Sequence, residues 1–193
     1  MSGESVSSDD EEPLAVNVKS TALEGTITIG GDTPPLSVYD DGEIYLRNAA
    51  GDRVFLSRTR SGTYSRRVVE GTYDVYYAVV NTQGGVPANG ETKLLADLTI
   101  KGDTLTIDID VPFVDFGGWT LPSLPTDSGK ARYFLRDSVT EDEVFIGKAG
   151  EDGAARLLPG DYDLVYRVET LGIGTPRNDG AVLACYSITA EAP

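Results

Sequence analysis

Histidine is absent from this sequence of 193 residues, and cysteine occurs once. Without histidine, the chain has neither the commonest general base nor the commonest transition-metal ligand of proteins. One cysteine cannot form an intrachain disulfide, and Cys185 stands in the run AVLACYSI, where a small strand residue is expected rather than a nucleophile. The sequence therefore predicts no catalytic residue, no cofactor-binding residue and no metal ligand, and the protein is not expected to be an enzyme.

Basic residues are scarce. The chain has 16 Lys and Arg against 31 Asp and Glu, a formal net charge of −15, so nucleic acids and anionic membranes would repel it at long range. Long apolar runs are also missing, because the densest, Tyr76–Val80, is far shorter than the roughly 18–20 residues that span a bilayer. Neither a nucleic-acid partner nor a direct membrane span is expected, and the acidity is typical of a well-solvated surface.

The first residues, MSGESVSSDDEEP, lack the apolar core of a signal peptide. Their polar and acidic composition predicts a disordered acidic tail over residues 1–13. A Ser/Gly/acidic lead of this kind also follows the lipid-bearing cysteine of bacterial lipoproteins. One interpretation is therefore that a signal segment and that cysteine preceded Met1, which would place the protein outside the cell or on its surface, with a lipid anchor as a further expectation.

What the sequence does contain is a repeat. GTYDVYYAV at residues 71–79 is matched by GDYDLVYRV at residues 160–168, which is 89 residues later, and VPAN at 86–89 is matched by TPRN at 175–178 with the same spacing. LAVNV at 14–18 also resembles LTIDI at 105–109 and marks the start of each copy. Two copies of one unit explain these matches together. The predicted domains are residues 14–103 and 104–193.

Within each copy the apolar period is two, as in the alternation of Leu105, Ile107, Ile109 and Val111 with polar residues. Glycine-rich turn signals separate the short runs, and no segment of ten or more residues carries a helical stripe. Short, half-buried, turn-connected strands are typical of antiparallel β-sandwiches. The predicted fold class is all-β, with two tandem antiparallel β-sandwich domains of the immunoglobulin-like kind or a related one.

The sequences VEGTY at 69–73 and LPGDY at 158–162, with a Leu-Arg strand and a Val-Phe-Leu or Val-Phe-Ile strand before them, resemble the carboxypeptidase-regulatory-like, transthyretin-like family of β-sandwich repeats. The likeness covers residues 43–77 and 133–166, and the second copy departs from it by having Ala155 where Tyr64 would be. It implies a non-catalytic accessory, adhesive or spacer module, often found in tandem in bacterial surface proteins. It carries no catalytic residues to transfer.

Several aromatic residues admit two interpretations. Alternation places Tyr73, Tyr77, Tyr162 and Tyr166 in the cores, with the first tyrosine of each copy capping backbone at a strand corner, rather than on a binding platform. Tyr76 faces the other way, so it either packs between the copies or binds a ligand. Trp119, the only tryptophan, is either an exposed contact for a sugar or protein or a plug over the second core.

Acidic residues leave two chemical alternatives open. The DSG sequence at 127–129 occurs once, so a turn is favoured over an aspartic-protease loop, although a carboxylate-pair hydrolase remains an alternative. Calcium ligands are plentiful at 40–41, 141–143 and 151–152, and in Asp103, Asp108 and Asp110, but no EF-hand loop is present and solvated turns compete with this interpretation. Gly-Lys at 129–130 and 147–148 lacks the pattern of a phosphate loop.

An asymmetry between the copies suggests self-association. After the apolar run 94–100, the first copy is followed by 105–111, whereas the second copy shows no such run after Ile188. Either 105–111 belongs to the second copy, or the second copy has an open edge that accepts residues 14–18 of a neighbouring chain. The predicted function is a non-catalytic structural or adhesive module of a bacterial cell-surface or secreted protein, with a protein, a glycan or itself as partner. A filament or coat subunit is the alternative.

Overall fold

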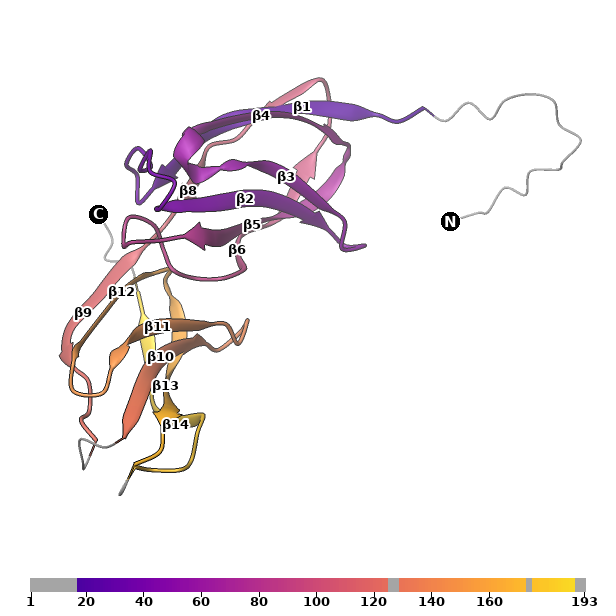
Figure 1. Ribbon diagram of the computed structural model, residues 1–193. Helices are drawn as coiled ribbons and strands as arrows, with labels where there is room; N and C mark the ends of the chain where they lie inside the picture. Colours follow the sequence, from indigo (N-terminus) through magenta and orange to yellow (C-terminus); the bar gives the residue numbers. More distant parts are fainter. Residues whose placement is uncertain (1–16, 125–128, 173–174, 190–193) are drawn as a thin grey trace, which may run out of the picture.

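The structure of the protein is a computed structural model that describes residues 17–124, 129–172 and 175–189 (Figure 1). The described residues are nearly all in β-strands, and their single helical element is the 3-10 turn η1, Thr59–Ser61. The predicted all-β class is confirmed. The acidic tail predicted at residues 1–13 lies outside the described residues, as do Asp127 and Ser128.

Eight strands form the N-terminal region, defined here as residues 17–111. One sheet has the order β4-β1-β7, with β8 also pairing with β1, and the other has the order β3-β2-β5-β6. The bounds of these strands are β1 Ser20–Ile29, β2 Asp41–Asn48, β3 Arg53–Arg58, β4 Thr63–Val69, β5 Gly71–Asn81, β6 Thr92–Ile100, β7 Thr104–Thr106 and β8 Ile109–Val111.

Six strands form the C-terminal region, defined as residues 114–189. A four-stranded sheet has the order β11-β10-β13-β14, and a two-stranded sheet pairs β12 with β9. Their bounds are β9 Val114–Thr120, β10 Lys130–Asp137, β11 Glu143–Lys148, β12 Asp152–Leu157, β13 Gly160–Thr170 and β14 Ala181–Ile188. Apart from the parallel pairs that β1 makes with β7 and β8, neighbouring strands are antiparallel.

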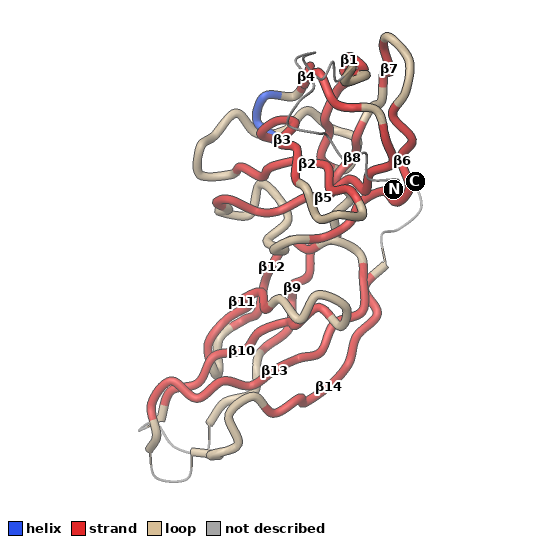
Figure 2. Tube along the Cα trace, turned by 90° about the vertical axis from the view of Figure 1, so that its right-hand side faces the viewer, coloured by secondary structure: helices blue, strands red, loops and turns tan. Residues whose placement is uncertain are grey.

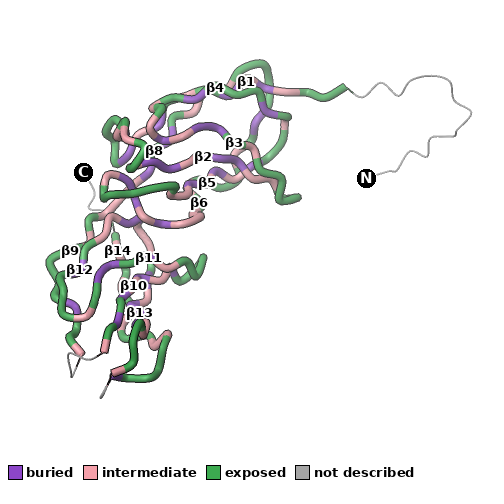
Figure 3. Tube along the Cα trace, in the orientation of Figure 1, coloured by how far each residue is buried: buried purple, intermediate pink, exposed green. Residues whose placement is uncertain are grey.

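Each region has its own apolar core, built from the inward side chains of its two sheets (Figure 3). Alternation decides which side chains these are, because successive residues of a strand point to opposite faces. In β5, Tyr73, Val75 and Tyr77 are buried, and in β13, Tyr162, Leu164 and Tyr166 are. Tyr73 Oη donates to the Val69 carbonyl at 2.9 Å and Tyr162 Oη to the Leu158 carbonyl at 2.8 Å, so the predicted tyrosine corners are confirmed.

Residues 104–111 lie differently from the predicted division of the chain, which assigned them to the second repeat. Strands β7 and β8 pair in parallel with β1, and Ile109 and Val111 belong to the N-terminal core. These strands therefore complete the first pair of sheets, because they satisfy the backbone groups along one edge of β1. The first packed region ends after Val111, and the chain enters β9 three residues later. Independent folding of the two regions stays a prediction.

The two regions follow one another end to end (Figures 1 and 2). In Figure 1 the strands of the N-terminal region run across the view and those of the C-terminal region run down it. The loop between β5 and β6 lies where the regions meet, whereas the loop between β13 and β14 lies at the far end of the C-terminal region. The β5–β6 loop therefore lies in the contact between the regions, whereas its counterpart in the repeat, the β13–β14 loop, lies away from that contact (Figure 1).

Candidate functional site

The contact between the two regions, called the junction below, is built around the β5–β6 loop and the β12–β13 corner. Asn89, which is 2% exposed, donates from Nδ2 to Tyr162 Oη at 2.7 Å and accepts at Oδ1 from the Leu158 amide at 2.7 Å. The Ala88 amide donates to the Arg156 carbonyl at 2.9 Å. Buried polar groups need such partners, so this network fixes how the loop meets the corner.

Apolar side chains interlock beside this network. Leu158 belongs by sequence to the C-terminal region, but it is 2% exposed and part of the N-terminal core. Ala88 of the N-terminal region packs against the C-terminal core. Tyr77 Oη donates to the Pro87 carbonyl at 2.7 Å and holds the loop from within. Each core therefore reaches into the other.

The hydroxyls of the junction keep their protons at neutral pH. Burial raises the pKa of Tyr162 to about 12, although the hydrogen bond from Asn89 opposes this shift. Burial also raises the pKa of Tyr77 well above its usual range, and the charge of Asp41 adds to it. The tyrosines of the junction therefore act as neutral hydrogen-bonding groups.

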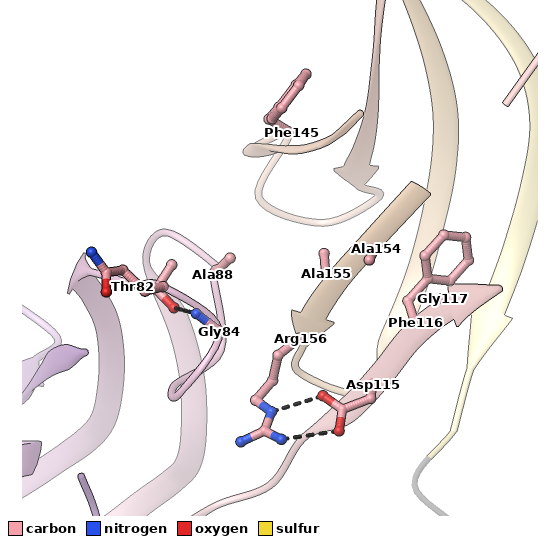
Figure 4. Close-up of a pocket in the computed structure, with 11 residues that line it drawn as sticks. Thr82, Gly84, Ala88, Asp115, Phe116, Gly117, Phe145, Ala154, Ala155 and Arg156 are labelled. Atoms are coloured by element: carbon pink, nitrogen blue, oxygen red, sulfur yellow. Dashed lines mark hydrogen bonds and ion pairs between the residues drawn. The ribbon is translucent and has the colours of Figure 1, made fainter. Parts of the chain in front are cut away.

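A cleft of about 600 Å³ opens on one side of the junction (Figure 4). Arg156 points toward Asp115 and binds it through two hydrogen bonds, Nε–Oδ1 at 2.8 Å and Nη2–Oδ2 at 2.9 Å, which hold the pKa of that carboxyl below its usual range. The guanidinium lies 3.8 Å from the centroid of the Phe113 ring. The cleft is lined by Thr82, Gln83, Gly84, Ala88, Asp115, Phe116, Gly117, Phe145, Ala154, Ala155 and Arg156. Its charges are mutually neutralised and its remaining lining is largely small or apolar.

A second hollow between the regions, of about 680 Å³, is lined in part by Tyr76. Tyr76 stacks on Tyr45 on the outer face of the N-terminal sheet, with ring centroids 5.4 Å apart and planes 10° apart, and Arg47 lies 4.7 Å above the Tyr76 ring. Tyr45 is fully buried beneath Tyr76 and its neighbours, although it is not part of the N-terminal core cluster, and Tyr76 packs where the regions face each other. The Glu91 amide donates to Asp142 Oδ2 at 3.1 Å across this hollow.

The acidic residues considered as ligands or catalysts serve mainly as hydrogen-bond acceptors. Asp108 Oδ1 accepts from the Thr26 amide and hydroxyl at 2.8 and 2.6 Å, and Asp110 Oδ1 accepts from the Thr28 hydroxyl at 2.7 Å. Within the described residues, no group of three or more His, Cys, Asp or Glu could hold a metal ion. A carboxylate-pair hydrolase needs a carboxyl group with a raised pKa. Hydrogen bonds instead hold the pKa below its usual range in six carboxyl groups: Asp74, Glu91, Asp108, Asp115, Asp163 and Glu169. Calcium stays a prediction without a located site.

Two singular residues lie on the surface of the C-terminal region. Cys185 is exposed on β14, and its Sγ donates to Asp163 Oδ1 at 3.1 Å, which raises the pKa of the thiol and disfavours the thiolate. Trp119 is 43% exposed and contacts Phe116 and Tyr186, with ring centroids 4.9 and 4.8 Å away. It therefore covers part of the core and remains open to solvent.

Sequence reasoning named no site residues and missed the residues that form the junction: Asn89, Leu158, Arg156 and Asp115. An asparagine in a glycine-rich loop is typical of a turn, so Asn89 alone carries no signal. The similarity of VPAN at 86–89 to TPRN at 175–178 is the one signal that could have indicated a role for this loop, because a simple turn would not need a similar four-residue sequence in both copies. Nothing local to Leu158 distinguishes it from Val69, its counterpart in the first copy.

Among the described residues, no helix has the length and apolar character that a membrane crossing requires. No family model matches the sequence, and no curated protein matches it.

Several solved structures are similar to this chain at low identity. The Bacillus anthracis TIE protein is 14% identical over 90% of this chain and 32% of its own, with a TM-score of 0.30. A DUF3823 family protein from Parabacteroides merdae is 14% identical over 79% of this chain and 92% of its own, with a TM-score of 0.34. The Streptococcal ancillary pilin is 13% identical over 89% of this chain and 59% of its own, with a TM-score of 0.34. The chain thus spans about a third of the TIE protein, and TM-scores this low carry no argument about function.

Proposed function

We propose that this chain is a non-catalytic structural module of a bacterial cell-surface or secreted protein, in which two β-sandwich domains are held at a fixed angle by the junction. The observation that carries the proposal is that the buried Asn89 side chain hydrogen-bonds through both Nδ2 and Oδ1 to the other region, to Tyr162 and Leu158 respectively. A flexible linker would leave these groups exposed to water. A buried and satisfied network instead stabilises one arrangement of the two bodies.

Rigidity also follows from the way the chain passes between the regions. The stretch from β8 to β9 is only Pro112 and Phe113, and Arg156 lies over the Phe113 ring. At Gly90, an added Cβ would lie 2.3 Å from the end of the Asp142 side chain of the other region, so the two regions approach closely there. A short connection, together with the hydrogen bonds of Asn89 and of the Glu91 amide to the other region, limits bending between the two regions.

The test is the substitution Asn89→Ala. It leaves the Leu158 amide unpaired and weakens the environment of Tyr162, at a cost of about 1–3 kcal/mol because both groups are buried. We expect small-angle scattering to show a broader distribution of maximum dimensions, and hydrogen exchange to rise at residues 156–162 before it rises in the cores.

Asn178→Ala is the matched control, because this asparagine is the counterpart of Asn89 in the repeat and is exposed. In dilute solution it should leave scattering and exchange unchanged. If the scattering profile of the Asn89→Ala protein matches that of the unaltered chain, the junction does not hold the two regions in one arrangement, and the proposed structural role is wrong.

An adhesive role is part of the proposal, with a protein or a glycan as the partner. The junction cleft is lined by half-exposed Phe145 on one side, by Phe116 on the other and by small residues between them (Figure 4), a surface of the kind on which rings and sugars pack. Substitution of Phe145 by Ala, scored on a glycan array and on immobilised matrix proteins, should remove any binding that the unaltered chain shows. Equal binding by both proteins would place the adhesive surface elsewhere.

A further inference from the structure

The first strand of each region has a different set of partners. Strand β1 pairs with β4 along one edge and with β7 and β8 along the other. Its counterpart β9 pairs with β12 in the equivalent register, since Thr120 faces Asp152 as Thr26 faces Thr63. In the part of the chain that the structure describes, β9 has no partner along its other edge. An open strand edge presents unpaired amides and carbonyls that can pair with another segment.

The aromatic side chains beside the equivalent edges of β1 and β9 differ between the two regions. In the N-terminal region Tyr64 faces Gly25, is 6% exposed and donates from Oη to the Ile107 carbonyl at 2.6 Å. In the C-terminal region the register places Gly153, rather than the expected Ala155, at the position of Tyr64, and Trp119 faces it. The aromatic ring thus comes from the opposite strand.

The segment between β7 and β8 explains the difference in exposure. It crosses so close to Gly25 that an added Cβ would lie 1.8 Å from the Ile107 carbonyl oxygen, and it covers the Tyr64 ring. Trp119 packs against the partly buried rings of Phe116 and Tyr186 and is still 43% exposed, and among the described residues no segment pairs with β9 beside it as 104–111 pairs with β1. A strand edge without a described partner and a half-exposed tryptophan therefore lie together on the C-terminal region.

The chain itself shows what kind of segment covers such an edge. Residues 105–111 immediately precede β9, the first strand of the second region, yet they pair with β1, the first strand of the region before it. Residues 14–18 immediately precede β1 and have the same alternating apolar sequence, LAVNV against LTIDI. Val18, the end of this segment, is 60% exposed and outside any strand.

We propose that residues 14–18 of a second copy of this chain pair with the open edge of β9 and cover Trp119, so that copies join head to tail. Each copy would then follow the previous one as the C-terminal region follows the N-terminal region within the chain. Such a contact uses two different surfaces, so it builds a series of copies, open or closed into a ring, rather than a two-fold dimer. The proposal goes beyond the rigid-module function and does not depend on it.

The two ends of the chain are complementary in a second, independent way. Within the chain, the junction joins Asn89 to Tyr162 and Leu158. In the repeat, the counterpart of Asn89 is Asn178, on the β13–β14 loop. The counterparts of Tyr162 and Leu158 are Tyr73 and Val69, at the β4–β5 corner. Val69 is 51% exposed, whereas its counterpart Leu158 is buried. This corner adjoins the start of β1, because the Glu70 amide donates to the Lys19 carbonyl at 3.1 Å. The corner and residues 14–18 would thus meet the neighbouring copy together.

The first experiment mixes two disabled forms of the full chain. Val16→Asp with Val18→Asp removes the donor segment, and Trp119→Lys removes the acceptor surface. We expect sedimentation at 0.3 M salt, which screens the net charge, to show a concentration-dependent series for the unaltered chain, monomers for each variant alone, and a one-to-one dimer when they are mixed. Leu36→Asp, which alters a still more exposed apolar residue elsewhere, should leave the series intact.

The second experiment does not depend on how Trp119→Lys folds. The peptide LAVNVKS, residues 14–20, is titrated into the Val16→Asp, Val18→Asp chain, whose only tryptophan is Trp119. Covering the ring should shift its emission to the blue and reduce quenching by acrylamide several-fold. The peptide LADNDKS should do neither.

Three outcomes would overturn the proposal. The unaltered chain stays monomeric up to millimolar concentration while the peptide leaves Trp119 unchanged. Association occurs but survives the loss of Val16 and Val18. Trp119 is already shielded from acrylamide in the monomer, which would mean that the chain covers its own edge.

Discussion

The two regions share strand alternation and a tyrosine corner, yet equivalent residues experience different surroundings. Asn89 is buried in the junction and Asn178 is exposed; Leu158 is buried and Val69 is half exposed. Tyr64, the ring of the β1–β4 pair, is buried, whereas Trp119, which the β9–β12 pair provides from the opposite strand, is 43% exposed. In each pair the difference arises from what lies next to the region, and not from the strand that carries the residue. The repeat therefore provides two copies of one scaffold, and the position in the chain determines which surfaces of each copy are used.

The largest expected effect contrasts Leu158 with Val69. Leu158→Ala opens a cavity where one region enters the core of the other, and we expect a loss of about 2–5 kcal/mol in the free energy of unfolding. Val69→Ala, at the equivalent corner, should cost less than about 1 kcal/mol because the side chain is half exposed. Urea denaturation followed by circular dichroism measures both. Equal losses would show that the junction adds nothing to the corner.

A second contrast concerns two glycines, Gly25, which faces the ring of Tyr64, and Gly153, which faces the ring of Trp119. Gly25→Ala would force the Ile107 backbone away from β1, at about 1–3 kcal/mol, since the crowded atom is a carbonyl oxygen. At Gly153 the nearest atoms belong to the flexible side chain of Leu121, at 3.1 Å, so Gly153→Ala should cost clearly less. Thermal unfolding gives the ranking, and exchange at residues 104–111 should rise in the Gly25 variant alone.

The tyrosine corners provide a finer contrast. Tyr162→Phe removes a hydroxyl that serves both the Leu158 carbonyl and the Asn89 side chain, and leaving these buried groups unpaired should cost about 1–3 kcal/mol. Tyr73→Phe removes one hydrogen bond, to the Val69 carbonyl, and should cost about 1 kcal/mol. The excess for Tyr162 measures the contribution of the junction. A larger loss at Tyr73 would contradict this account.

The smallest effect is on the dependence of stability on alkaline pH. The pKa of Tyr162 is about 12 in the folded protein, and that of Tyr64 is also about 12, against about 10 for an unfolded tyrosine. Only the unfolded chain loses these protons between pH 10 and 12, so stability is fully present below pH 10 and falls as the pH rises through that window. Urea titrations from pH 9 to 12 should show this fall, and a shallower one in Tyr162→Phe and Tyr64→Phe. An unchanged slope in these variants would assign the fall to other groups.

Much of the fold could be predicted from sequence. Alternation placed Tyr73, Tyr77, Tyr162 and Tyr166 in the cores, and the Gly-x-Tyr sequences predicted the corners. The pairing of β7 and β8 could not be predicted, since a run such as LTIDI fits either neighbour equally well and only the chain's path in space selects β1. For the same reason the sequence does not decide between a plug and an exposed contact at Trp119; in the structure it covers part of the core and is 43% exposed, and a role as a contact stays a prediction.

By itself, the sequence of this protein determined which segments become strands, which face of each strand is apolar and that one unit occurs twice, because these properties follow from residues a few positions apart. Only the tertiary structure decided that Asn89 is buried against Tyr162, that Leu158 enters the neighbouring core and that one edge of β9 has no described partner. Contacts between residues about 70 positions apart depend on how two completed regions pack, which no local pattern encodes.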